Sequence, residues 1–155
     1  MARRRNISLF TLGYEGLSVP QMLAELKAAS IDVLFDIRYR PQSRKPGFSK
    51  NALSAACERA GIRYLHDPKL GTPPDQMKAM KAAGEYTSTA FKQYRKFLLK
   101  QGESLRQAVD VARKNNTCLL CYEADYRSCH RRIVAEEIVD RSGLPVRHLA
   151  VDGKA

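Results

Sequence analysis

The sequence predicts a single α/β domain with a Rossmann-like, three-layer architecture, in which helices flank a mainly parallel sheet of about five strands. Short apolar runs alternate along the chain with longer segments whose apolar residues recur at helical spacing, which is the pattern of βαβ units. The length of 155 residues is in the usual range for one domain, and no linker or internal repeat divides the chain. We therefore expect one domain over residues 1–155, with residues 1–6 as a basic N-terminal tail.

Five segments have the composition of β-strands. Residues 33–37 form an apolar run interrupted only by Asp36, as expected of a strand that is buried on both faces. Residues 146–149 are shorter and more polar, which favours an edge position. The predicted strands are residues 7–12, 33–37, 62–65, 117–122 and 146–149.

Helices are predicted between the strands because their ends have typical capping residues. Gln21 follows Ser18 at the spacing of a capping box. Ser128 is a suitable N-cap for the last long helix, which is predicted to end at Gly143. The remaining helices are expected from Ser49 to Gly61, around Met77 and Met80, over residues 87–100 and over residues 103–114.

The chain is strongly basic. It has 27 Lys and Arg residues against 16 Asp and Glu residues, which gives a formal net charge of +11 at pH 7. The cations cluster at Arg3 to Arg5 and between Arg38 and Lys50. Such clusters favour phosphate-bearing partners, either nucleic acid or a small molecule. The Pro-containing loop from Arg38 to Gly47 is predicted to be irregular and to direct cations into a cleft.

The sequence has no apolar stretch long enough for a signal peptide or a membrane span, so we expect a cytoplasmic protein without a membrane partner. In a reducing compartment its cysteines are not expected to form disulfides. Zinc is an alternative use of Cys118, Cys121, Cys129 and His130. Residues three apart on a strand face opposite sides of the sheet, however, which separates Cys118 from Cys121. We therefore expect no bound metal and no cofactor.

Polar residues follow the carboxyl ends of the predicted strands, where open α/β sheets bind ligands. If the fourth strand lies beside the first, these residues converge on one cleft. The candidate catalytic residues are Glu123, Asp36 and Glu15, as general acid, base or nucleophile, and Cys129 as a nucleophilic thiol. The candidate anion- and substrate-binding residues are Tyr14, Arg38, Arg40, Arg44, Cys121, His130 and Arg131.

The predicted start of the last helix, residues 128–131, offers backbone N–H groups and a positive dipole end to an anion. An ordinary capped helix with solvated arginines is the competing interpretation. Cys129 is equally compatible with an activated nucleophile and a buried, inert thiol. The spacing from Cys121 to Arg127 matches that of cysteine phosphatases, but Glu123 and Asp125 would repel a phosphate there. We interpret that match as chance.

Five motifs together resemble a known family. They are TLGYE near the start, DIRYRPQSRKPGF, the pair Leu70-Gly71, CLLCYE and CHRR. In this order they are similar to the prokaryotic family called domain of unknown function 488, and the resemblance covers most of the chain. It implies a Rossmann-like α/β domain with these motifs gathered in one pocket, and it implies no particular reaction.

Two functions therefore remain open from the sequence. The first is an enzyme, a hydrolase or transferase, that acts on a nucleotide, nucleoside or nucleic-acid component with cleft carboxylates and arginine-bound phosphate. The second is a non-catalytic nucleic-acid-binding module that uses the loop from Arg38 to Lys50 and the N-terminal arginines.

Overall fold

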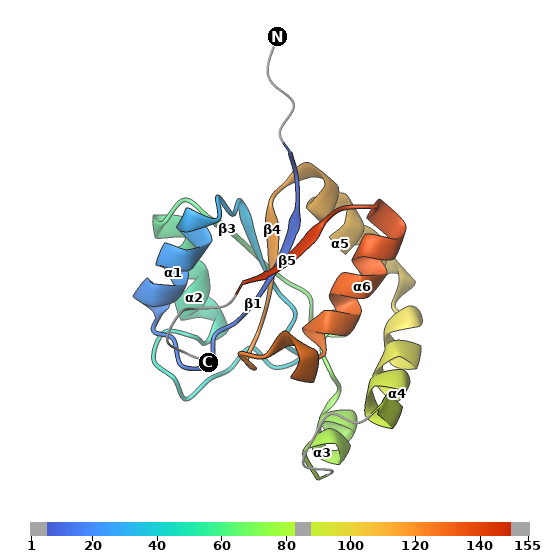
Figure 1. Cartoon of the computed structure of the whole chain (residues 1–155). Helices are drawn as coiled ribbons and strands as arrows, with labels where there is room; N and C mark the ends of the chain where they lie inside the picture. Colours follow the sequence, from blue (N-terminus) through green and yellow to red (C-terminus); the bar gives the residue numbers. More distant parts are fainter. Residues whose placement is uncertain (1–5, 83–87, 150–155) are drawn as a thin grey trace.

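The computed structural model describes residues 6–82 and 88–149, and it shows one all-parallel, five-stranded sheet between layers of helices (Figure 1). The predicted α/β class is therefore confirmed. The strands are β1 (Leu9–Gly13), β2 (Val33–Asp36), β3 (Arg63–His66), β4 (Thr117–Cys121) and β5 (Val146–Leu149).

The strand order is β3-β2-β4-β1-β5, so β4 lies between β1 and β2. The chain winds outward from β1 through β2 to β3, then returns to insert β4 and adds β5 beside β1. This confirms that the fourth strand lies beside the first and that β5 is an edge strand. The direction of winding reverses between β1 and β2, which is where ligands bind in open α/β sheets.

Helices cover both faces of the sheet (Figure 1). One face packs against α1 (Val19–Ala28) and α2 (Lys50–Arg59), and the other against α4 (Ser88–Leu99), α5 (Gly102–Lys114) and α6 (Arg131–Ser142). Between β3 and α4, α3 (Pro74–Ala82) lies at the end of α4. In residues 6–82 and 88–149, no helix combines the length and the apolar character that crossing a membrane requires.

The core consists of two apolar clusters, one on each face, because side chains alternate along the strands. Cys118 belongs to the cluster on the α1 and α2 side, whereas Cys121 belongs to the cluster on the α5 and α6 side. The predicted separation of these two cysteines is therefore confirmed.

Local capping explains the start of α1 and the end of α6. Ser18 and Gln21 form the predicted capping box, with Gln21 N donating to Ser18 Oγ at 3.2 Å and Ser18 N donating to Gln21 Oε1 at 2.8 Å. Gly143 ends α6 in the left-handed conformation, with φ of 74°. The predicted N-cap of α6 was wrong: His130 occupies that position, because a short 3-10 helix, η2 (Tyr126–Ser128), precedes it.

Candidate functional site

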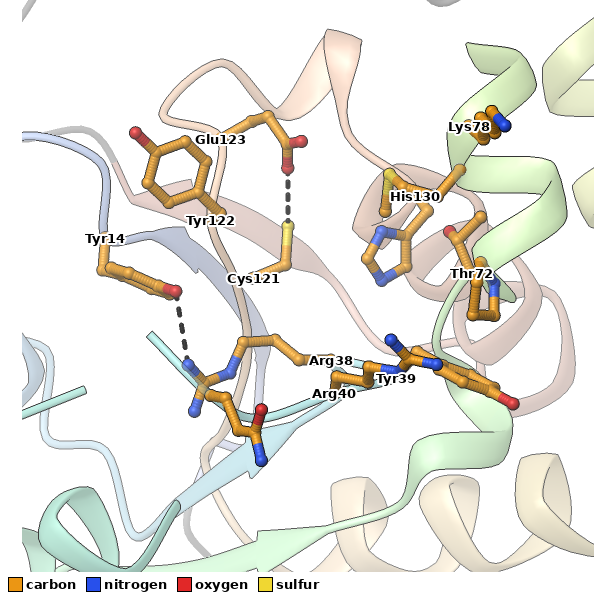
Figure 2. Close-up of a pocket in the computed structure, with 13 residues that line it drawn as sticks. Tyr14, Arg38, Tyr39, Arg40, Thr72, Lys78, Cys121, Tyr122, Glu123 and His130 are labelled. Carbon is orange, nitrogen blue, oxygen red and sulfur yellow. Dashed lines mark hydrogen bonds between the residues drawn. The ribbon is translucent and has the colours of Figure 1, made fainter. Parts of the chain in front are cut away.

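A cavity of about 670 Å³ opens at the carboxyl ends of the strands, between the end of β4, the loop after β2 and helix α3 (Figure 2). It lies at the edge of the sheet where the sequence predicted the site. Six of the predicted residues line it, namely Tyr14, Arg38, Arg40, Cys121, Glu123 and His130. The other lining residues are Tyr39, Gln42, Thr72, Pro74, Met77, Lys78 and Tyr122.

One wall of the cavity is a buried network around Arg38. Arg38 Nε and Nη2 donate to the Asp36 carboxylate at 2.9 and 2.7 Å. Arg38 Nη1 donates to the Tyr14 hydroxyl at 3.2 Å (Figure 2). Burial acts to lower the pKa of Arg38, but the hydrogen bonds and charge of Asp36 outweigh it and raise that pKa above its usual value. Arg38 is therefore a fixed cation in the wall.

Asp36, predicted as a catalytic carboxylate, does not line the cavity. It is fully buried, and its carboxylate also accepts a hydrogen bond from the Tyr64 hydroxyl. Burial, followed by the charge of Asp36, raises the pKa of Tyr64 well above its usual value. Asp36 thus positions Arg38 from behind the cavity lining.

Glu15, another predicted catalytic residue, also lies outside the cavity lining. Its Oε1 accepts a hydrogen bond from the backbone N–H of Ala124 at 3.0 Å. The backbone N–H groups of Tyr14 and Glu15 bond to the carbonyls of Cys121 and Tyr122 at 3.1 and 2.8 Å. Glu15 therefore orders the loop that follows β4, because the chain after β1 continues beside that loop.

Arg131, which the sequence predicted to bind an anion at the start of α6, is fully buried. Its guanidinium donates to Thr11 Oγ1 at 3.2 Å, to the Glu123 carbonyl, and to the Ala124 carbonyl at 3.0 Å. Burial lowers the pKa of Arg131 to about 10. The side chain turns back beneath the strand ends, where it supports the loop after β4.

Some backbone N–H groups at the start of α6 already face acceptors within the protein. The N–H of Arg132 bonds to the Cys129 carbonyl at 3.1 Å, and the N–H of Arg131 lies 3.5 Å from Cys129 Sγ. These contacts arise because η2 leads directly into the helix. The start of α6 therefore offers fewer backbone N–H groups to an anion than the sequence suggested.

The structure joins Cys121 and Cys129 in a disulfide, and both residues are buried. The expectation that all cysteines are unpaired was therefore wrong for this pair. The short segment between β4 and α6 folds back and brings Cys129 under the end of β4, which the spacing in the sequence does not reveal. Cys57 and Cys118 are free and buried, and burial raises the pKa of Cys57 to about 11.

His130 is held in the cavity wall by contacts with two other elements. Its Nε2 lies 3.3 Å from the carbonyl oxygen of Ile37, and its ring meets Tyr94 edge to face with centroids 5.4 Å apart. Nδ1 lies 4.0 Å from Cys129 Sγ. Burial lowers the pKa of His130 below its usual value, which favours the neutral imidazole.

The family model for "Domain of unknown function DUF488" matches residues 18–138. The chain belongs to this family. The matched region includes every residue that lines the cavity except Tyr14. Neither the curated proteins nor the solved structures give a significant match to the chain.

Several cavity residues of this DUF488 domain were missed by the sequence reasoning. Lys78 lies on α3, and Thr72 lies in the segment before it. These residues reach the cavity only through the tertiary packing of the chain, which the local sequence does not reveal. The Leu70-Gly71 motif was the one feature of the sequence that could have indicated that this segment approaches the cavity. A Cβ atom on Gly71 would lie 2.3 Å from the backbone N of Tyr39, so glycine permits this close approach.

A second cleft of this DUF488 domain, about 850 Å³ in volume, adjoins the first and shares Tyr39, Arg40 and Gln42 with it. Arg44 and Lys50 line this second cleft, so Arg44 does not reach the cavity as predicted. The reason is that the loop turns away after Gln42 and continues toward the start of α2. The cations of the loop after β2 are therefore divided between the first cavity and the neighbouring cleft.

Proposed function

We propose that this DUF488 domain is an enzyme that acts on a nucleotide or a related nucleoside-bearing phosphate, as a hydrolase or transferase, with Glu123 as the reacting carboxylate. One observation supports this proposal most: a single cavity at the switch in strand order has aromatic rings, exposed cations and a carboxylate in its lining. A nucleotide has an aromatic base, a phosphate and a reactive centre between them.

Two exposed rings are suited to contact a base. Tyr39 is 39% exposed and Tyr122 is 49% exposed, and both line the cavity. Aromatic side chains stack on bases without requiring a particular base sequence. Tyr14, by contrast, is buried and stacks on Phe48 with centroids 4.4 Å apart, so it forms part of the wall.

Two exposed cations from different elements are suited to bind the phosphate. Arg40 lies in the loop after β2, and Lys78 lies on α3 (Figure 2). Thr72 lines the same cavity, and its buried Oγ1 has no hydrogen-bond partner among the described residues. A ligand oxygen can supply the missing partner of this hydroxyl.

Glu123 is the only one of the three predicted catalytic carboxylates that lines the cavity in the described part of the chain. Its Oε2 lies 3.5 Å from Cys121 Sγ, on the same side of the cavity as Tyr122 (Figure 2). This position supports a role as general acid, general base or nucleophile at the reactive centre of the substrate.

Glu123→Gln is expected to lower kcat by about 100-fold or more on a substrate found in a panel of nucleotides, because general acid–base catalysis contributes about 10²–10⁴-fold. Product formation is measured by mass spectrometry, and nucleotide affinity is expected to change little. Glu58→Gln, which removes an exposed carboxylate on α2, is the matched control. Full turnover by the Glu123→Gln variant would contradict the catalytic role.

Arg40→Ala and Lys78→Ala are each expected to weaken binding of a nucleoside monophosphate by about 10-fold, or 1.4 kcal/mol, in calorimetric titrations. Binding of the uncharged nucleoside is expected to change much less, because each variant removes a phosphate partner. Arg44→Ala is the control for the first cavity, since Arg44 lines only the neighbouring cleft. An equal loss with nucleoside and nucleotide would argue against phosphate binding by these cations.

The neighbouring cleft favours nucleic-acid binding as the second candidate function. Arg40, Arg44 and Lys50 line it together with several uncharged polar residues. If the domain is a binding module, Arg44→Ala and Lys50→Ala should each weaken oligonucleotide binding. Each variant that removes a phosphate partner should also make the log–log dependence of affinity on salt shallower by about 0.7 for a single strand. Glu123→Gln should then have little effect. The N-terminal arginines, Arg3 to Arg5, lie outside the described residues.

A further inference from the structure

We propose that Cys121, Cys129 and His130 form a binding site for a thiophilic divalent cation such as Zn²⁺ when the two cysteines are reduced. The ligand atoms of these three residues all lie within 4.8 Å of one another, and all three residues are buried. Metal binding by these three residues does not require the proposed nucleotide chemistry.

Strand geometry keeps Cys118 from sharing a zinc ion with Cys121, and it excludes no other residue of the predicted set. Cys118 packs in the cluster on the α1 and α2 side of the sheet, on the opposite face from Cys121 and Cys129. Cys129 and His130 come from the turn before α6 and meet Cys121 on the opposite face. Three metal-ligating side chains therefore lie close together, and Cys118 is not one of them.

The backbone spacing suits two sulfurs that share an ion. The Cα atoms of Cys121 and Cys129 are 7.6 Å apart. This exceeds the range of about 4.4–6.8 Å usual for a disulfide. Two thiolates at about 2.3 Å from a tetrahedral zinc have sulfurs about 3.8 Å apart, which a wider backbone spacing accommodates.

The orientation of His130 is also that of a metal ligand. Its Nε2, at 3.3 Å from the Ile37 carbonyl, has the geometry of a donor to that oxygen, and this leaves the Nδ1 lone pair toward Cys129 Sγ, 4.0 Å away. Metal-binding histidines commonly donate the second ring N–H to a backbone carbonyl in this way. The edge-on contact with Tyr94 further fixes the ring.

Hydrogen-bond donors face both sulfur atoms. Arg131 Nη1 lies 3.5 Å from Cys121 Sγ, and the backbone N–H of Arg131 lies 3.5 Å from Cys129 Sγ. Donors and a positive charge at these positions favour thiolates, which are the form of cysteine that binds metals.

The site would open into the cavity. Cys121 and His130 line the cavity, and Glu123 Oε2 lies 3.5 Å from Cys121 Sγ (Figure 2). Three protein ligands with a fourth position open to a pocket are the arrangement of catalytic rather than structural zinc sites. The ligand set therefore differs from a closed four-residue structural site.

The disulfide and the metal complex are alternative states of the same pair. Reduction of the disulfide consumes two electrons and two protons, which a phosphine reductant and water supply in the experiment. Binding of Zn²⁺ to the resulting dithiol then releases the two thiol protons to solvent. The oxidised pair has no thiolate and should not bind the ion.

The test is metal binding by the full chain, reduced with a phosphine under anaerobic conditions and titrated with Co²⁺ as a spectroscopic substitute for Zn²⁺. We expect one ion per chain, with the absorption of tetrahedral cobalt and a sulfur-to-cobalt charge-transfer band, and displacement of Co²⁺ by Zn²⁺. The oxidised chain is expected to show neither band. Absence of stoichiometric binding by the reduced wild-type chain would overturn the proposal.

Variants identify the ligands. We expect metal affinity to fall by at least about 100-fold in each of the variants Cys121→Ser, Cys129→Ser and His130→Gln. Removing a residue that only hydrogen-bonds to a metal ligand typically lowers affinity less, by about 10–100-fold. Cys118→Ala is the matched control, because it removes a buried thiol from the opposite face, and it should keep full binding. Equal loss in Cys118→Ala and Cys129→Ser would also overturn the site.

Discussion

Gly13→Ala is expected to destabilise the protein by about 3 kcal/mol and to disrupt the cavity at the strand ends. A Cβ atom on Gly13 would lie 1.7 Å from the Glu123 carbonyl oxygen and 2.8 Å from Arg131 Nη1. The first contact is with backbone, so the loop after β4 must move, and overpacking of this kind costs about 1–3 kcal/mol. The displaced loop also loses its hydrogen bond from Arg131.

The free energy of unfolding of Gly13→Ala is measured by denaturant titration with circular dichroism, together with nucleotide binding. Gly102→Ala is the control, because a Cβ atom there meets nothing within 4 Å and the position lies at the start of α5. That variant is expected to stay within about 0.5 kcal/mol of the wild type. A stable Gly13→Ala protein with unchanged binding would show that the loop after β4 is not fixed by this contact.

Arg131→Met is expected to lower the free energy of unfolding by about 3–5 kcal/mol. Methionine fills much of the same volume but cannot donate to Thr11 Oγ1 or to the carbonyls of Glu123 and Ala124. Each buried acceptor that loses its partner costs about 1–3 kcal/mol. The loop between β4 and η2 should therefore lose its main support.

Arg132→Met is the matched control for this experiment. Arg132 is exposed, and its ion pair with Glu136 at 3.0 Å is an i,i+4 surface pair, typically worth about 0.3–0.5 kcal/mol. Both variants are compared by denaturant titration. If Arg131→Met instead kept wild-type stability while losing phosphate binding, Arg131 would be a ligand-binding residue as the sequence suggested.

The fold and the position of the cavity were largely predictable from the sequence. The continuous apolar run over β2, the capping box at Ser18 and the glycine at 143 are local features, and each corresponds to an element in the structure. Strand alternation also separated Cys118 from Cys121 correctly. These features depend on backbone geometry within a few residues, so no knowledge of distant parts of the chain was needed.

The tertiary structure alone decided which polar side chains face the cavity. Asp36 and Arg131 end in the interior because their hydrogen-bond partners, Tyr64 on β3 and the carbonyls of Glu123 and Ala124, come from other segments of the chain. Lys78 lines the cavity because α3 packs against α4 on the side of the domain where the strands end. The sequence by itself determined the main helices and strands, their parallel pairing and the edge of the sheet where the cavity opens. The direction of each side chain at that edge depends on packing between segments distant in the sequence, so only the folded chain specifies it.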